Sequence, residues 1–167
     1  MKIFHKVPKY SQHLHIKNKD WKTKTCGIAG LCMILEYFDK KIPAEMLLNQ
    51  GLKIKAYLPG IGWKHKGIVK LAKKFRLNGK NFDWAKLNTK TAFLKLKNYL
   101  KKYPILASIH LNFNPKNGGH LVVITGISET KIFYNDPDSK TEKQISKSIP
   151  IKKFLTGWKK RIIVIYP

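Results

Sequence analysis

The spacing of hydrophobic and polar positions changes partway along the chain, and the change predicts two kinds of secondary structure. Before Pro104, apolar residues recur every three or four positions, as they do in amphipathic helices. After Pro104, they alternate with polar residues or form short runs, which is typical of strands. We therefore expect an α+β fold, with helices first and antiparallel strands second.

The best-defined helix covers residues 26–38. Thr25 stands at its N-cap position, and apolar residues nearly surround the helix, so we expect it to be buried on several sides. Its main apolar stripe consists of Ile28, Leu31, Cys32, Leu35 and Phe38. Further helices are predicted at 44–50, with Gly51 at the end, at 66–75 and within 87–103, with a loop over 52–63.

Strands are predicted in the second half of the chain. They cover residues 105–111, 120–127, 131–135 and 161–166, and a short strand is predicted at 3–7. The polar residues 128–130 form a turn between two of them, so residue 120 is expected near residue 135 or 136. The order of elements does not fit a parallel Rossmann-type sheet, and the sequence has no Gly-rich phosphate loop.

Length and cysteine content narrow the class of protein. The chain has 167 residues, enough for a single domain over 1–167 with a hydrophobic core. Cys26 and Cys32 are too few for a disulfide scaffold or a four-cysteine zinc site, and one helix would hold them beyond disulfide reach. The sequence has neither a membrane-spanning apolar run nor a secretory signal, so we expect a cytoplasmic protein; release without a leader stays open. We also expect a monomer.

The chain is strongly basic. Lysines and arginines number 34 against nine acidic residues, a formal charge of +25, and only Arg76 and Arg161 are arginines. Such a charge attracts polyanions, but lysine without arginine is weak evidence for reading nucleic-acid bases. Two interpretations remain: a solvated lysine-rich surface, or a non-catalytic basic module that binds an anionic polymer such as nucleic acid or a cell-envelope polymer.

Three positions carry candidate chemistry. Cys26 begins the buried helix, where the helix dipole favours a thiolate, and Gly27 beside it leaves room for a substrate. His120 follows Gly119 at the start of a strand, and Asp136 ends the next strand. A thiol, an imidazole and an orienting carboxylate make up a cysteine nucleophile system. Taken singly, each position is more often packing or a turn.

Four stretches carry a family resemblance. Residues 7–12, 25–35, 119–126 and 134–137 resemble the papain-like cysteine peptidases that process bacteriocin leaders after a double glycine, and their stand-alone relatives. The resemblance implies a two-lobed fold in which a helix carrying the nucleophile packs against an antiparallel sheet. It also implies roles for Cys26 as nucleophile, His120 as general base and Asp136 as the residue that orients the base.

The resemblance suggests further site residues. Gln12, the only glutamine before the cysteine, is the candidate oxyanion donor, and Gly27 and Gly119 are candidate substrate contacts. The implied reaction is hydrolysis of a peptide or peptide-like amide through a thioester, with acyl transfer left open and no metal or organic cofactor. The absence of an attached transporter and the basic charge argue against carrying over the double-glycine leader specificity.

Overall fold

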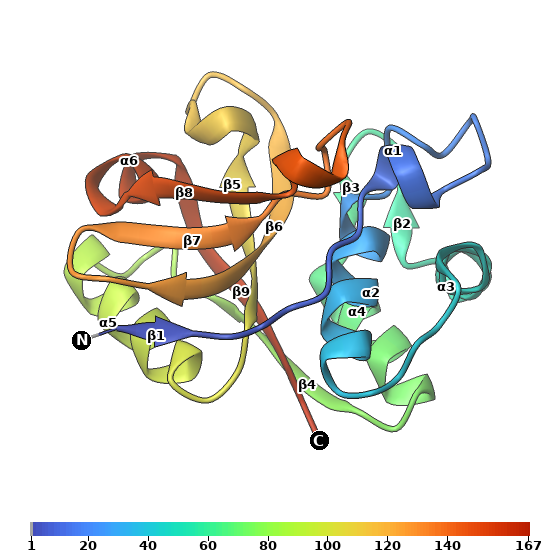
Figure 1. Cartoon of the computed structure of the whole chain (residues 1–167), viewed down its shortest axis with the longest axis horizontal. Helices are drawn as coiled ribbons and strands as arrows, with labels where there is room; N and C mark the ends of the chain where they lie inside the picture. The colour runs from blue at the N-terminus through green and yellow to red at the C-terminus, as the bar shows by residue number, and fades with distance from the viewer. Residues whose placement is uncertain (1) are drawn as a thin grey trace.

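An antiparallel sheet separates two groups of helices in the computed structural model, which describes residues 2–167 (Figure 1). The strand order is β4-β9-β5-β6-β7-β8, with β1 beside β6. The strands are β1 (Ile3–Phe4), β4 (Asn78–Asp83), β5 (Ile105–His110), β6 (Gly119–Ile127), β7 (Lys131–Asn135), β8 (Ser146–Pro150) and β9 (Trp158–Tyr166). A separate hairpin consists of β2 (Tyr57–Leu58) and β3 (Gly62–Trp63).

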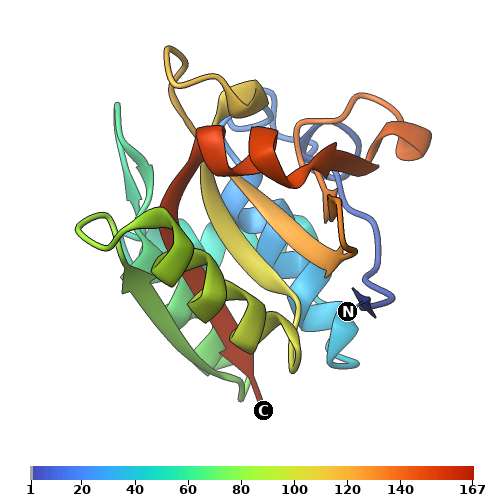
Figure 2. The ribbon, with the colours of Figure 1, turned by 90° about the vertical axis from the view of Figure 1, so that its left-hand side faces the viewer.

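The helices lie on both faces of this sheet. They are α1 (Gln12–His15), α2 (Cys26–Tyr37), α3 (Ala44–Lys53), α4 (His65–Lys74), α5 (Thr89–Leu100) and α6 (Ile151–Gly157). Figure 2 shows α5 and α6 in front of the sheet and α2 behind it. No helix within residues 2–167 is long and apolar enough to span a bilayer.

Strand alternation explains the two cores. Leu106 and Val123 belong to the cluster that contains the α2 side chains, whereas Ile105 and Val122 belong to the cluster under α5 and α6. Because neighbouring side chains of a strand point to opposite faces, the apolar runs of β5 and β6 serve both clusters. The α+β fold class is confirmed, and helix α2 lies against β6 as the papain-like fold requires.

The helix carrying the candidate nucleophile follows the prediction closely, but its cap does not. Thr25 stands at the N-cap of α2, yet its hydroxyl makes no capping bond, and its buried Oγ1 has no hydrogen-bond partner in the described part of the chain. The predicted end of the next helix at Gly51 is wrong, because α3 continues to Lys53. A Cβ at Gly51 would lie 2.8 Å from Cζ3 of Trp63, so this glycine allows close packing of the indole.

Several elements differ from the predictions. The loop predicted over 52–63 contains the β2–β3 hairpin, the strand predicted at 3–7 covers only Ile3–Phe4, and the last strand begins at Trp158 instead of residue 161. Strands β4 and β8 and helices α1 and α6 were not expected. Strand β4 has little apolar alternation and exists through its ladder with β9, so the sheet also recruits the helical half of the chain.

The N-terminal segment crosses from one lobe to the other (Figure 1). Its path is held by the end of β7 and the turn after it: Nδ2 of Asn135 donates to the carbonyl of Pro8 at 3.2 Å, and the N–H of Gln12 donates to the carbonyl of Pro137 at 2.9 Å. These bonds bring Gln12 beside the turn that follows Asp136, although more than 120 residues separate them in the sequence.

Candidate active site

Cys26 and His120 meet at the junction of the two lobes. Cys26 is the first residue of α2 and is partly exposed, whereas His120 is the second residue of β6 and is 8% exposed. The thiol of Cys26 and the imidazole of His120 lie close enough for each to shift the pKa of the other. The packing of α2 against β6 therefore brings together two residues that lie far apart in the sequence.

The imidazole also contacts Asp136. Nε2 of His120 lies 2.8 Å from Oδ1 of Asp136, which leaves Nδ1 for the thiol. The expected proximity of residues 120 and 136 is confirmed, but through another register: Asn135 pairs with Val123, and the ladder shifts between Ile124 and Gly126. The carboxylate thus reaches the ring from beyond the end of the paired strand.

Asp136 has two further partners. Nζ of Lys147, on β8, lies 2.7 Å from Oδ2, and the backbone N–H of Asp138 donates to Oδ1 at 3.0 Å. Burial alone would raise the pKa of Asp136, but its bond to His120, the Lys147 ion pair and this N–H outweigh burial and hold the pKa well below its usual range. The carboxylate is ionised and fixed in orientation.

Opposing effects act on the thiol and the imidazole. Burial raises the pKa of Cys26, but the hydrogen bond and charge of His120, with the backbone N–H groups of Leu121 and Gly27, bring it below the usual value. Burial lowers the pKa of His120, but Asp136 and Cys26 raise it well above the usual value. Both shifts favour a thiolate beside an imidazolium.

Gln12, the candidate oxyanion donor, lies in α1 and lines a pocket that Cys26 and His120 also line. It is 3% exposed, and its Nε2 donates to Oδ1 of Asp138 at 3.1 Å. Oδ1 of Asp138 also lies 2.7 Å from Nε2 of His13. Oε1 of Gln12 is buried and has no hydrogen-bond partner among residues 2–167. The carboxamide is therefore held on its nitrogen side only.

Two pockets meet at Cys26 and His120. One, here called the β9 pocket, has a volume of about 330 Å³ and extends toward Asp83, Lys159 and Arg161. The other, here called the α1 pocket, has a volume of about 400 Å³ and extends toward Gln12. Their shared walls are residues of the β2–β3 hairpin on one side and of the start of β6 on the other. A chain lying across Cys26 would occupy both pockets.

The two glycines predicted to contact substrate differ. Gly119 is exposed and lines both pockets. Gly27 is buried and lines neither pocket. The prediction that its missing side chain leaves room for a substrate is therefore wrong. A Cβ at Gly27 would lie 2.8 Å from Cγ of Trp63, whose indole N–H donates to the carbonyl of Lys24 at 2.7 Å. Glycine at position 27 gives room to the indole.

Cys32 has the packing role expected from its apolar stripe. It is 1% exposed, and burial, with a smaller contribution from Glu36, raises the pKa of its thiol to about 12. The sequence pattern did not point to Lys147 or Asp138. The acidic residue two positions after Asp136 was a usable signal for Asp138, whereas nothing near Lys147 in the sequence distinguishes it from the other lysines.

Known proteins share this fold and arrangement of elements. The sequence profile of the Peptidase_C39 like family matches residues 4–162. A structure of a double glycine motif protease from an AMS/PCAT transporter, in complex with the leader peptide, superposes with a TM-score of 0.67 at 21% identity, covering 98% of this chain and 94% of that one. No curated protein sequence matches the chain.

Two further structures have the same fold. The peptidase domain of Streptococcus ComA, described as a bifunctional ABC transporter of a quorum sensing pathway, gives a TM-score of 0.66 at 19% identity, with 87% and 93% coverage of the two chains. A chain assigned as a C39-like peptidase from Bacillus anthracis gives 0.70 at 16% identity, with 100% and 98% coverage. Because the family profile spans nearly the whole sequence, the chain belongs to the Peptidase_C39 like family, with its papain-like fold.

Proposed function

We propose that residues 1–167 form a single peptidase domain that cleaves a peptide, or a peptide-like amide, through Cys26, His120 and Asp136. The observation that carries this proposal is the unbroken series of contacts from thiol to imidazole to ionised carboxylate, placed where two pockets meet. A nucleophile, a base and a group that orients the base are the parts that acyl transfer to sulfur requires.

The proposed reaction has two stages. His120 holds the proton of the Cys26 thiol while the thiolate attacks the carbonyl carbon of the substrate. The tetrahedral intermediate then collapses to a thioester as the imidazolium gives its proton to the leaving amine. In the second stage His120 takes a proton from water, the resulting hydroxide attacks the thioester, and the acid and the free thiol are released. An amine in place of that water would give acyl transfer.

Two N–H donors are available for the oxyanion. The first is the backbone N–H of Cys26, which stands in the first turn of α2, where N–H groups have no partner within the helix. The second is the carboxamide of Gln12, because one hydrogen of Nε2 is directed at Asp138 and the other remains. Together with the thiol of Cys26, His120, Asp136 and water, these two donors are sufficient for the proposed reaction, which needs no cofactor.

The substrate is proposed to be a peptide or a protein segment. The β9 and α1 pockets give an extended chain a place on both sides of the nucleophile. The AMS/PCAT transporter protease, which has the same fold, is described in complex with a leader peptide, which supports a peptide as the ligand. Cleavage after a double glycine is not part of the proposal, and we propose that the protein acts as a monomer.

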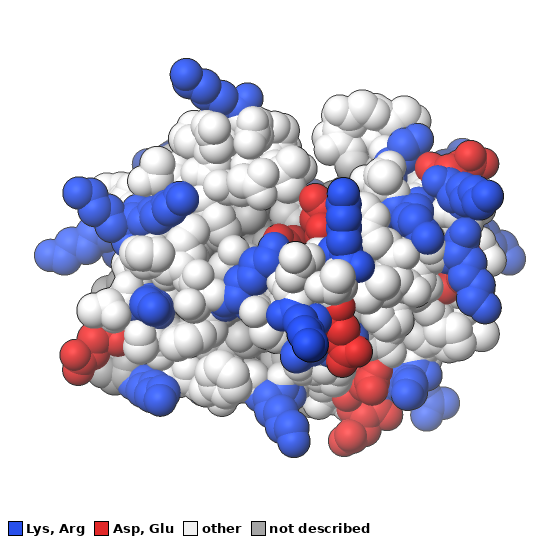
Figure 3. All heavy atoms as spheres, turned by 45° about the horizontal axis from the view of Figure 1, so that its top comes forward, with Lys and Arg blue, Asp and Glu red and all other residues white. Residues whose placement is uncertain are grey.

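The net charge of +25 favours a second candidate, a basic module that binds an anionic polymer. Such a module needs a continuous cationic surface. On the face shown in Figure 3, lysines are scattered over both lobes with uncharged surface between them. The salt dependence of the activity distinguishes the two candidates. Binding of an anionic polymer would weaken steeply as salt is added, whereas cleavage of a short peptide would depend on salt far less.

The proposal is tested with a library of peptides prepared from a whole proteome. Wild-type protein and Cys26→Ala are incubated with the library, and new peptide ends are identified by mass spectrometry. We expect new ends only with the wild type, together with a thioester adduct on Cys26 that hydroxylamine releases. The absence of new ends, with a Cys26 that reacts no faster than a free thiol, would contradict the proposal and favour the binding module.

A further inference from the structure

The β9 pocket carries more positive than negative charge. Lys64, Lys159 and Arg161 line it, and Asp83 is its one carboxylate within residues 2–167. Nε of Arg161 lies 2.9 Å from Oδ2 of Asp83, so these two charges neutralise each other. The lysines remain, and Lys159 is the more enclosed of the two, since Lys64 is exposed.

A bulge in β9 places Lys159. Between the positions that pair with Ile109 and Ser108 of β5, β9 holds two extra residues, Lys159 and Lys160. Lys160 has a φ of 55°, in the left-handed region that costs a side-chain-bearing residue energy. Its Nζ donates to the carbonyl of Leu87 at 2.6 Å, outside the β9 pocket. Bulges of this kind redirect side chains, often beside active sites.

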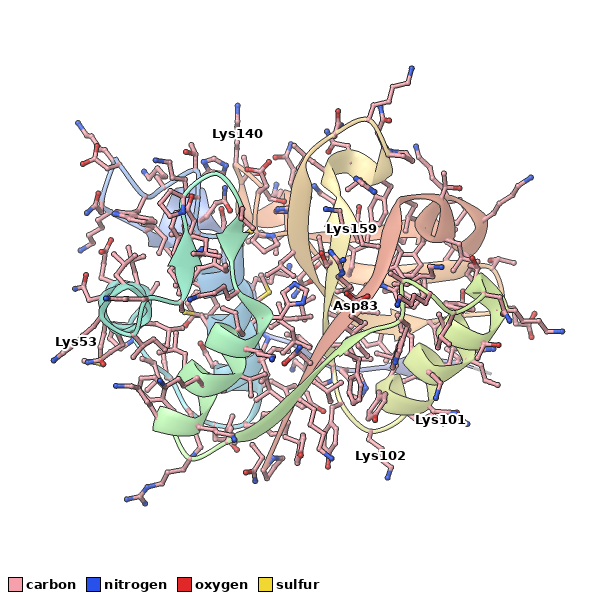
Figure 4. All side chains as sticks on the ribbon, turned by 180° about the vertical axis from the view of Figure 1, so that it is seen from behind. Lys53, Asp83, Lys101, Lys102, Lys140 and Lys159 are labelled. Carbon is pink, nitrogen blue, oxygen red and sulfur yellow. The ribbon has the colours of Figure 1, made fainter. Side chains whose placement is uncertain are left out.

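The ammonium group of Lys159 lies beside Gly119, the residue before the proposed base. Its Nζ is 3.1 Å from the point that a Cβ of Gly119 would occupy, and Gly119 directly precedes His120. Figure 4 shows Lys159 and Asp83 beside β9 in the region between the two lobes. A substrate bound at Cys26 and extending into the β9 pocket would pass this ammonium.

No carboxylate compensates Lys159 within the part of the chain that the structure describes, because the ion pairs there involve other cations. The neighbouring His65 adds little charge at neutral pH, because burial, then Arg161 and Lys159, lower its pKa against the opposing effect of Asp83. A half-buried ammonium without a counter-charge favours an incoming anion, since the anion restores interactions lost with water.

We propose that Lys159 forms an anion subsite in the β9 pocket that binds a carboxylate of the peptide substrate within a few residues of the scissile bond. This inference rests on the proposed peptidase function and names its substrate class, an acidic peptide. The carboxylate comes from an aspartate or glutamate side chain or from the end of the substrate chain, and both present the same group to the ammonium.

The first test compares cleavage of matched peptides. A cleaved sequence from the proteome library is resynthesised with Glu, Gln or Lys at each position near the scissile bond, once with an amidated and once with a free C-terminus. We expect kcat/KM for the best Glu peptide to exceed that of its Gln analogue by about tenfold, the size of a charge-assisted hydrogen bond. Preference for the free C-terminus instead would assign the carboxylate to the chain end.

The matched variants are Lys159→Glu and Lys101→Glu, which change the net charge equally. Lys101 is exposed at the end of α5, far from the pocket in Figure 4. We expect Lys159→Glu to reverse the preference toward the Lys peptide, Lys159→Arg to retain the preference for Glu, and Lys101→Glu to change neither. Equal cleavage by the wild type of Glu and Gln peptides, and of amidated and free C-termini, would overturn the inference while leaving the peptidase function intact.

A second test needs no peptide cleavage. The rate of Cys26 alkylation by iodoacetate, an anion, is divided by the rate with neutral iodoacetamide. The cation of His120 affects this ratio equally in all variants, so a fall of about tenfold in Lys159→Glu but not in Lys101→Glu would support the subsite. An unchanged ratio would overturn it, even if no peptide is ever cleaved and the proposed function has failed by the library test.

Discussion

Nζ of Lys147 lies 2.7 Å from Oδ2 of Asp136, while the other oxygen of that carboxylate faces His120 at 2.8 Å. Lysine and histidine thus compete for one negative charge. The lysine fixes the carboxylate and also weakens its effect on the imidazole, because a nearby cation opposes a second positive charge.

Replacing Lys147 by Met should therefore raise the pKa of His120 further above its usual value. The carboxylate loses a competing cation, and the imidazolium loses a repulsive neighbour, so both effects have the same sign. The pKa is measured by ¹⁵N NMR titration of the imidazole from neutral to strongly alkaline pH. Lys131→Met, at the exposed start of β7, removes the same charge and should leave His120 unchanged. A lower pKa in Lys147→Met would contradict this account.

The two cysteines should differ strongly in reactivity. The pKa of Cys26 is below its usual value, whereas that of Cys32 is raised to about 12 by burial and Glu36, so iodoacetamide should label Cys26 alone in the folded protein. Labelling of Cys26 should persist below pH of about 8.5, the pKa of a free thiol, and slow at neutral pH in His120→Ala. Mass spectrometry of tryptic peptides gives both rates.

Denatured protein provides the control for this experiment, because both thiols should then react alike. Equal labelling of Cys26 and Cys32 in the folded protein, or a Cys26 rate indifferent to His120, would refute the ion pair.

Gln12→Ala should lower kcat for a cleaved peptide by about 10²–10³-fold, the usual cost of losing one oxyanion donor. Its effect should be confined to the transition state, so the rate of Cys26 alkylation should stay near that of the wild type. Gln50→Ala, in α3 and outside both pockets, is the matched control and should not alter kcat. A parallel loss of kcat and of thiol reactivity in Gln12→Ala would indicate a structural role instead.

Alanine at Gly27 should cost far more stability than alanine at Gly119. The new Cβ at position 27 would lie 2.8 Å from Cγ of Trp63, a ring atom that cannot move alone, whereas at position 119 it meets only the flexible end of Lys159 at 3.1 Å. We expect Gly27→Ala to reduce the free energy of unfolding by about 1–3 kcal/mol, as overpacking does. Urea unfolding measures both variants; equal losses would show that Trp63 can move freely.

Local pattern was enough for much of the fold and for the three proposed catalytic residues. The helix at Cys26–Tyr37 and the strand at Lys131–Asn135 follow from apolar periodicity and turn residues, which act over a few positions. Cys26, His120 and Asp136 stood out because each begins or ends such an element. The resemblance then supplied Gln12, which no local pattern distinguishes.

Other features depend on contacts between distant parts of the chain. Strand β4 is formed by its ladder with β9, and an indole from β3 packs where a Cβ at Gly51 would lie. Lys147 differs from the other lysines only through its position opposite β7, and Lys159 only through a bulge beside β5. Hydrophobic periodicity in the sequence indicates which face of a helix or strand is buried. The tertiary fold decides which charged side chains meet, because strand register and packing set the distances between them.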